Sequence, residues 1–454
     1  MSLRSLSPAT GKKLRTYPAF SVSDTSAIID ATHTAWLDWR DLELPARARC
    51  LREVASRLNS LKHELAEIIT AEMGKPLKAS RSEIEKCAWV CEYFADNAQF
   101  FLHEEPVKTE AAQSYIHFEP LGVILAVMPW NFPFWQLFRF AAPALMAGNA
   151  CVLKHASNVS GCALAIEQLF REAGSPGNLL RTLLISSDQV EDVIWNDKIR
   201  AVTLTGSTAA GREIAATAGR ALKKTVLELG GSDPYLVLAD ADIEYAARTC
   251  ASSRLINTGQ SCIAAKRFIV VEAVYEKFES AFVEKMKQAK MGDPMQEDTE
   301  LGPLAREDLR DALHKQVRAS VEQGAQVLLG GAKPEGAGNF YPATVLAEVA
   351  PGMPVFDEET FGPVAALIRA RDEAEAIQLA NKSIYGLGSA VFSKDTARAE
   401  AVARQLETGF VAINDFVRSD PRLPFGGVKD SGYGRELGPY GIKEFVNIKT
   451  VYIK

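Results

Sequence analysis

The 454-residue sequence has few cysteines for its length and no paired-cysteine motif. Its seven cysteines are an odd number, and no two of them have the C-x-x-C spacing of zinc sites and redox motifs. The six histidines are scattered singly, so we expect no metal site. Free thiols without partners are typical of a reducing compartment, which predicts a cytoplasmic protein.

Long apolar runs are also lacking, as is an excess of positive charge. No stretch of about 18 apolar residues could cross a bilayer, and the first residues, MSLRSLSPATGKK, contain no apolar signal core. The formal net charge is −6, whereas nucleic acids and anionic membranes favour proteins with a basic face. We therefore expect neither nucleic acid nor a membrane as a partner.

Short apolar runs alternate with amphipathic segments from about residue 120 onward. The length already predicts more than one domain. Runs typical of buried parallel strands occupy residues 122–127, 151–154, 201–205 and 224–229, with predicted helices between them at 134–147, 160–174 and 207–220. A second alternation of the same kind starts at residue 234. The pattern predicts two doubly wound α/β domains.

The two ends of the chain have different patterns. The first hundred residues predict three helices: one in SVSDTSAIIDATHTAWLDW (21–39), one from Pro45 to a C-cap at Gly74, and one over about 77–101. The last residues, EFVNIKTVYIK (444–454), alternate apolar and polar side chains as a strand does. This strand could pair with a segment outside its own domain.

Cys262 ends the polar, glycine-containing segment NTGQSC, residues 257–262. A cysteine is more often a small core residue, as the apolar surroundings of Cys250 suggest for that thiol. A polar turn instead predicts an accessible side chain, and converging backbone N–H groups favour the thiolate. The turn makes Cys262 a candidate nucleophile, although the residue pattern by itself leaves a structural role open.

Glu228 closes an apolar run in TVLELGGSDP and is followed by two glycines. A charge at this place is not expected in the centre of a buried sheet. One interpretation is a solvated carboxylate at a strand end. The other is a general base, because ligand sites of α/β sheets form at the carboxyl ends of parallel strands.

The segment TGSTAAGREI, residues 205–214, follows a predicted strand and opens a predicted helix. It contains neither the Lys-Ser/Thr pair of a P-loop nor the G-x-G-x-x-G dinucleotide pattern. A helix start of this kind can still bind one phosphate through free N–H groups. The alternative is an ordinary helix N-cap.

Two polar residues stand out in VMPWNFPFWQLFRF, residues 127–140. Asn131 lies between bulky neighbours, where its side-chain amide could donate to a developing oxyanion. Arg139 lies within an apolar helix and therefore needs an anionic partner, for which an internal salt bridge is the default.

Seven segments occur together in one order: PWNFP, LKHAS, TGST, LELGG, NTGQSC, EETFGP and PFGGVKDSGYGRE. Each is weak evidence by itself, but together they resemble the aldehyde dehydrogenase superfamily over essentially the whole chain. The segment DPRLPFGG is most similar to the shorter bacterial succinate-semialdehyde dehydrogenases.

The resemblance implies two Rossmann-like doubly wound α/β domains plus a β-strand extension for oligomerisation. The implied cofactor-binding domain comprises residues 1–105 and 126–229, and the implied catalytic domain comprises residues 230–425. The implied oligomerisation segment comprises residues 106–125 and 426–454. A homodimer or homotetramer is therefore expected.

The resemblance also implies a role for each matching residue. Cys262 matches the nucleophile, Glu228 the general base, and Asn131 the oxyanion donor that acts with the Cys262 N–H. Arg139 and Ser419 match contacts to the substrate carboxylate. The matching cofactor contacts are Trp130, Lys154, Ser157, Gly206, Ser207, Leu229, Glu359 and Phe361.

Two departures from the family pattern bear on the ligands. Ser157 stands where NAD-preferring relatives usually carry a glutamate, and a neutral serine beside Lys154 tolerates a 2′-phosphate. This predicts NADP as cofactor with NAD as the weaker alternative, unless Ser157 only caps the helix near residue 160. Ile256 stands where longer succinate-semialdehyde dehydrogenases carry an arginine, so one expected carboxylate contact is missing.

The expected reaction is oxidation of succinate semialdehyde to succinate through a thiohemiacetal and a thioester on Cys262. Another semialdehyde or an aliphatic aldehyde is the alternative substrate. A coenzyme A-acylating relative would have little need of Glu228, and a cysteine hydrolase would leave TGST and EETFGP unexplained. The joint presence of Cys262, Glu228 and Asn131 argues against an inactive structural protein.

Overall fold

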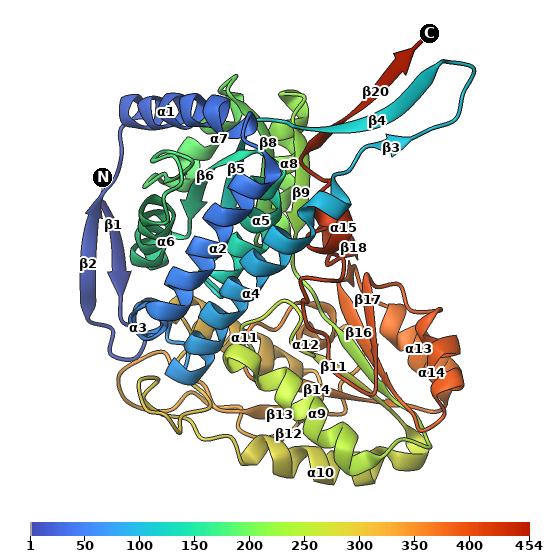
Figure 1. Cartoon of the computed structure of the whole chain (residues 1–454). Helices are drawn as coiled ribbons and strands as arrows, with labels where there is room; N and C mark the ends of the chain where they lie inside the picture. Colours follow the sequence, from blue (N-terminus) through green and yellow to red (C-terminus); the bar gives the residue numbers. More distant parts are fainter. Residues whose placement is uncertain (1) are drawn as a thin grey trace.

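The computed structural model describes residues 2–454 and contains the two predicted α/β sheets (Figure 1). The first sheet has six strands in the order β19-β9-β8-β5-β6-β7. Its parallel strands are β5 (Val123–Met128), β6 (Ala150–His155), β7 (Leu180–Thr182), β8 (Ile199–Thr205) and β9 (Lys224–Glu228). The short β19 (Gly432–Tyr433) pairs antiparallel with β9. The strands predicted from apolar runs are confirmed.

Eight α-helices precede or connect these strands. They are α1 (Val22–Arg40), α2 (Leu44–Ser60), α3 (Lys62–Met73), α4 (Leu77–Phe101), α5 (Trp135–Met146), α6 (Ser160–Glu172), α7 (Val190–Trp195) and α8 (Thr208–Arg220). The single helix predicted from Pro45 to Gly74 is wrong, because the chain breaks at Leu61 into α2 and α3. Asn59 and Ser60, which have low helix propensity, precede the break. Gly74 does end α3 in the left-handed conformation, with φ of 84°.

The N-terminal residues also form a hairpin that the sequence patterns did not predict. Its strands are β1 (Ser2–Leu6) and β2 (Lys13–Pro18), which pair antiparallel. Most of their side chains are exposed, so the hydrophobic alternation that marks a strand is weak here.

The second sheet has seven strands in the order β12-β13-β14-β11-β10-β16-β17. They are β10 (Pro234–Val237), β11 (Arg267–Val271), β12 (Gln326–Leu329), β13 (Thr344–Ala347), β14 (Val364–Ala370), β16 (Gly388–Phe392) and β17 (Phe410–Ile413). All neighbours are parallel except β12, which pairs antiparallel with β13. The short strands β15 (Tyr385–Gly386) and β18 (Val428–Lys429) pair with each other outside this sheet.

Helices cover both faces of the second sheet, and each face has its own apolar core. One core contains α9 (Ile243–Leu255) and α10 (Tyr275–Lys287). The other core contains α11 (Glu307–Glu322), α12 (Pro354–Asp357), α13 (Glu373–Asn381) and α14 (Thr396–Ala403). This is the doubly wound arrangement that was predicted. No helix within residues 2–454 is long and apolar enough to cross a membrane.

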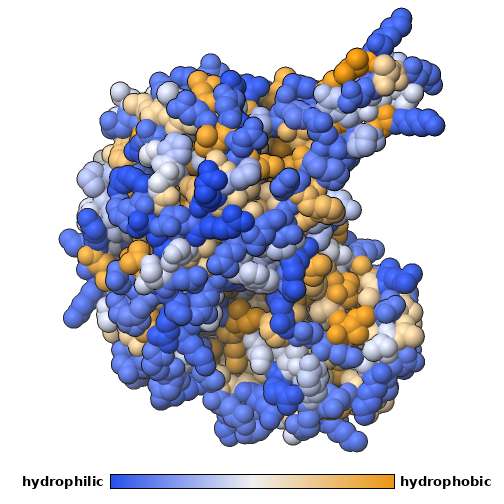
Figure 2. All heavy atoms as spheres, viewed as in Figure 1, coloured by the Kyte–Doolittle hydropathy of each residue, from blue (hydrophilic) through white to orange (hydrophobic). Residues whose placement is uncertain are grey.

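A three-stranded antiparallel arm projects from the body of the molecule (Figure 1). It consists of β3 (Glu105–Pro106), β4 (Gln113–Pro120) and the C-terminal β20 (Val446–Ile453), with β4 in the middle. The predicted terminal strand is confirmed, and its partner is a segment more than 300 residues earlier in the chain. The arm carries apolar side chains on its surface (Figure 2), including Ile448, which is 61% exposed.

The predicted domain boundaries stay predictions; one strand crosses a boundary, and another pairs across one. β5 begins at Val123, inside the segment 106–125, and β19 joins the six-stranded sheet from within the segment 426–454. The short helix α15 (Gly438–Gly441) lies between β19 and the arm strand β20.

Candidate active site

The predicted site residues of the first sheet lie at the carboxyl ends of its parallel strands. Asn131 follows β5, Lys154 lies near the end of β6, Gly206 follows β8, and Glu228 ends β9. Because these four strands are parallel neighbours, their carboxyl ends meet at one edge, where α/β sheets form ligand sites.

The turn before Cys262 has an unusual backbone. Asn257, Thr258 and Gly259 are all left-handed, with φ values of 53°, 56° and 74°. A Cβ at position 259 would overlap the carbonyl oxygen of Gly362, so only glycine allows the segments NTGQSC and EETFGP to approach this closely. The left-handed conformation is costly for Asn257 and Thr258 and persists only when the surroundings hold it.

Side-chain amides connect this turn to the loop after β5. Asn257 Nδ2 donates to the carbonyl oxygen of Asn131 at 2.7 Å. Asn131 Nδ2 in turn donates to the carbonyl oxygen of Gln260 at 3.1 Å. One amide hydrogen of Asn131 therefore positions the turn, and the other is free for the predicted oxyanion role.

Two fully buried cations hold the carbonyl groups on either side of the turn. Arg254 Nη2 donates to the carbonyl oxygen of Gly259 at 2.6 Å. Lys266 Nζ donates to the carbonyl oxygens of Ser261, Cys262 and Ala264 at 3.1, 2.8 and 3.1 Å. Hydrogen bonds to charged groups are stronger than neutral ones, so these two side chains fix the backbone around Cys262.

Cys262 is half-buried, whereas the other six cysteines, all within the described residues, are buried. Desolvation raises the pKa of the Cys262 thiol to about 12. The nearby cations of Arg139 and Lys266 lower this pKa, and the carboxylates of Glu359 and Glu228 raise it. The thiol is therefore neutral at neutral pH, and forming the nucleophilic thiolate requires transfer of its proton.

Glu228 is only 2% exposed, so the interpretation as a solvated strand-end carboxylate is wrong. Neither carboxylate oxygen has a hydrogen-bond partner within residues 2–454. Burial raises the pKa of Glu228 well above its usual range, although Arg139 lowers it. A Cβ at Gly426 would lie 2.7 Å from Glu228 Oε1, so the PFGG segment packs against this carboxyl group. A buried carboxyl group of high pKa suits proton transfer near neutral pH.

Arg139 forms the internal salt bridge that the sequence left open. Its guanidinium pairs with Glu436, and the two side chains are 2% and 3% exposed. Arg139 Nη2 also lies 3.3 Å from Thr205 Oγ1, and the guanidinium lies over the Phe425 ring, 4.6 Å from its centroid. Arg139 nevertheless lines the cavity described below, so its predicted contact with substrate stays a prediction.

Three of the predicted cofactor contacts, Trp130, Glu359 and Phe361, lie close to the turn before Cys262 or to each other. The rings of Trp130 and Phe361 are edge to face, with centroids 5.6 Å apart. Glu359 Oε1 accepts a hydrogen bond from the Gly231 backbone N–H at 3.1 Å. A Cβ at Gly231 would lie 2.7 Å from the carbonyl oxygen of Cys262. The glycines after Glu228 therefore bring the end of β9, the EETFGP loop and the nucleophile turn into contact.

Helix α8 begins beside the end of β9. Ser207 caps the helix, accepting from the Ala210 N–H at 3.3 Å, so the N-cap interpretation is confirmed. The Gly206 N–H donates to the Glu228 carbonyl oxygen at 2.9 Å, and Leu229 packs tightly against Gly211 of α8. Phosphate binding at this helix start stays a prediction.

Ser157 is exposed and begins the 3₁₀ turn η1 (Ser157–Val159). Neither η1 nor the following α6 has a side-chain cap, so the alternative that Ser157 only caps a helix is wrong. Lys154 is half-buried, burial lowers its pKa, and it forms no ion pair with a carboxylate of the described residues. Both side chains are free to contact a ligand.

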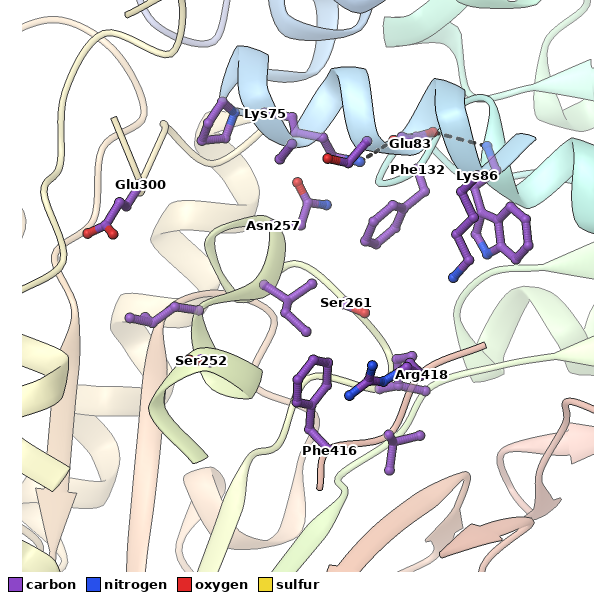
Figure 3. A pocket seen from close by; sticks show the side chains of 18 of the residues that line it. Lys75, Glu83, Lys86, Phe132, Ser252, Asn257, Ser261, Glu300, Phe416 and Arg418 are labelled. Carbon is purple, nitrogen blue, oxygen red and sulfur yellow. Dashed lines mark hydrogen bonds and ion pairs between the residues drawn. The ribbon is translucent and has the colours of Figure 1, made fainter. Parts of the chain in front are cut away.

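A cavity of about 740 Å³ has Cys262 among its lining residues (Figure 3). Its walls come from α4, α5, α9, the nucleophile turn and the loop 416–419. The lining residues include Lys86, Phe132, Trp135, Arg139, Cys262 and Ser419. Ser419, predicted as a substrate contact, therefore shares one cavity with the predicted nucleophile.

Four charged residues of the site were not predicted from the sequence, and one of them, Arg254, lies three residues before the motif NTGQSC. Lys266 follows the motif NTGQSC, and Glu436 lies within PFGGVKDSGYGRE, so proximity to these motifs was an available signal for both. Lys86 lies on α4 far from every motif, and nothing in the sequence distinguishes it from a solvated helix residue.

Comparisons with known proteins agree with this geometry. A model of the aldehyde dehydrogenase family matches residues 1–451. A succinate semialdehyde dehydrogenase [NAD(P)+] of Escherichia coli strain K12 is 48% identical, covering 99% of this chain and 97% of its own. A probable succinate-semialdehyde dehydrogenase [NADP(+)] of Synechocystis is 46% identical over the full length of both.

A solved structure has nearly the same fold as this chain. Succinic semialdehyde dehydrogenase from Streptococcus pyogenes, in complex with NADP+, superposes with a TM-score of 0.97. It is 39% identical in sequence, and the match covers 99% of both chains. With the sheets, the nucleophile turn and these matches in agreement, the chain belongs to the aldehyde dehydrogenase family.

Proposed function

We propose that this enzyme oxidises succinate semialdehyde to succinate with NADP as oxidant, and that NAD is the weaker cofactor. The observation that carries the reaction is the anchored turn, which presents the half-buried Cys262 to a cavity beside Asn131 and Glu228. The assignment of substrate and cofactor rests on the similarity to succinate-semialdehyde dehydrogenases that use NADP or NAD(P), at 46–48% identity.

Cys262, Asn131 and Glu228 would each carry out a different part of the reaction. The Cys262 thiol loses its proton to water, and the thiolate sulfur adds to the aldehyde carbon. The oxyanion that forms accepts hydrogen bonds from the second Asn131 amide N–H and the Cys262 backbone N–H. NADP, when bound, supplies the hydride acceptor. The acyl group then left on Cys262 is a thioester, and Glu228 removes a proton from the water that hydrolyses it.

The free polar groups at the sheet edge fit NADP. We assign the 2′-phosphate to Ser157 and Lys154, because both are available and neither repels an anion. The start of α8 at Gly206 and Ser207 would hold the pyrophosphate. Trp130, Leu229, Glu359 and Phe361 would hold the nicotinamide end, and Arg139 and Ser419 would contact the substrate carboxylate.

Replacing Glu228 should separate the half-reaction that reduces the cofactor and acylates Cys262 from the half-reaction that hydrolyses the thioester. In Glu228→Gln, steady-state turnover of succinate semialdehyde should fall roughly 100-fold or more, while a burst of about one reduced cofactor per site survives. Stopped-flow absorbance at 340 nm measures both. Because burial raises the pKa of Glu228, wild-type deacylation should accelerate as pH rises through that pKa, and the variant should lose this dependence. Unchanged steady-state turnover would remove Glu228 from the mechanism.

Restoring a carboxylate at position 157 should change the cofactor. Wild type should have a higher kcat/KM for NADP than for NAD. Ser157→Glu should lower this ratio at least about tenfold, because the carboxylate repels the 2′-phosphate. Asn158→Glu, one residue further along η1, is the matched control. A wild type that prefers NAD, or an equal effect of both variants, would refute the assignment.

We further propose that a second copy of the chain covers the arm, and that the domains follow the boundaries given above. β20 is an open sheet edge that exposes Ile448 and Tyr452, and such edges are usually covered. Ile448→Glu should therefore shift the protein to smaller species in sedimentation velocity, whereas Asn447→Glu on the opposite face should not. A monomeric wild type would contradict the proposal.

A further inference from the structure

Lys86 is an unpaired cation inside the cavity. Its side chain extends from α4 towards the cavity, with Phe416 and Arg418 on the far side (Figure 3). The ammonium group lies over the Trp135 ring, 4.2 Å from its centroid, and donates to Ser419 Oγ at 2.9 Å. It forms no ion pair with a carboxylate of residues 2–454.

Neighbouring cations of the same cavity are already neutralised. Lys75 pairs with Glu83, and Arg139 pairs with Glu436. Arg418 Nη2 lies 2.6 Å from Asp415 Oδ1. Glu83, one turn before Lys86 on the same helix, also accepts hydrogen bonds from the backbone N–H groups of Phe134 and Trp135, and within the described residues its ion pair is with Lys75 and not with Lys86. Lys86 is therefore the unpaired cation beside Ser419. Lys78, Arg248 and Lys285 also line the cavity without an ion pair among the described residues, but none of them contacts Ser419.

The hydroxyl group of Ser419, beside Lys86, also lacks a partner. It is 6% exposed, and its oxygen accepts hydrogen bonds from Lys86 Nζ and from Trp135 Nε1, the latter at 3.1 Å. A hydroxyl oxygen that accepts two hydrogen bonds still has its own proton to donate. No acceptor for that proton is present among the described residues. The Ser419 hydroxyl proton and the remaining N–H groups of Lys86 thus lie close together without an acceptor among the described residues.

The electrostatics favour an anion at this place. Burial, and next the charge of Arg139, lower the pKa of Lys86 to about 8. The ammonium is thus still mostly protonated at neutral pH, but it is less stable there than in water. An anion bound within hydrogen-bond distance would restore that stability, and a carboxylate would also satisfy the Ser419 hydroxyl.

We propose that Lys86, together with the Ser419 hydroxyl, binds the terminal carboxylate of the substrate and selects aldehydes that carry one. The inference rests on the proposed function and identifies a residue that sets its specificity. Ile256, which stands where an arginine contact was expected from the resemblance, lines the same cavity. Lys86 supplies the missing second cation from a different element, helix α4.

The test compares two aldehydes of equal chain length with saturating NADP. Butanal has the four carbons of succinate semialdehyde but no carboxylate. Lys86→Met, which keeps the length and loses the charge, should lower kcat/KM for succinate semialdehyde roughly 10- to 100-fold, mainly through KM. The same variant should change kcat/KM for butanal less than about threefold. Lys86→Arg should retain most of the preference, because it keeps the charge.

Lys78→Met is the matched control. Lys78 is on the same helix, at the exposed rim of the same cavity, so its loss changes the net charge equally. It should leave the preference for succinate semialdehyde intact. Thermal unfolding and NADP affinity of each variant report whether the fold survives.

The outcomes separate the two proposals. A wild type that does not prefer succinate semialdehyde over butanal overturns the proposed function and with it the role of Lys86. A wild type that does prefer it, with Lys86→Met affecting both aldehydes equally, overturns Lys86 alone. The role of Lys86 is also overturned if Lys86→Arg loses as much kcat/KM for succinate semialdehyde as Lys86→Met does. It is overturned as well if the control Lys78→Met loses as much as Lys86→Met.

Discussion

The site depends on a strained turn that buried charges hold in place. Three successive left-handed residues, 257–259, would relax in a free peptide, because non-glycine residues avoid this region. Arg254 and Lys266 hold the carbonyl groups on either side, and the side chain of Asn257 ties the turn to the loop of Asn131. Because the proposed oxyanion donors lie on these same two segments, one set of hydrogen bonds would orient the proposed nucleophile and its stabilising groups together.

The charged residues near Cys262 and the cofactor residues are either paired within the protein or left without a carboxylate partner. Arg139 and Glu436 neutralise each other in the interior beside Glu228, which limits the cost of burying them. Lys86 and Lys154 remain without carboxylate partners, one in the cavity near Cys262 and one at the sheet edge. Unpaired buried or half-buried cations are unstable unless a ligand supplies the anion, so their positions indicate where a carboxylate and a phosphate would bind.

The sequence predicts those features that depend on local pattern. The parallel strands were found because buried strands are continuous apolar runs, as in residues 123–128. The β1–β2 hairpin was missed because its side chains are mostly exposed. The sequence left open whether Glu228 is solvated, since its burial depends on Gly426 and Glu436, about 200 residues later in the chain. Lys86 was missed for the same reason: its partners Trp135 and Ser419 come from distant segments.

The central claim is that the turn presents one reactive thiol out of seven. Alkylation of the native, cofactor-free protein with iodoacetamide, followed by peptide mass spectrometry, tests it most directly. Cys262 alone should be modified, activity should be lost in proportion, and the rate should keep rising between about pH 7 and 10, because the thiolate reacts and its pKa is raised to about 12. Modification of Cys250 at a similar rate, or full activity after Cys262 is alkylated, would contradict the account.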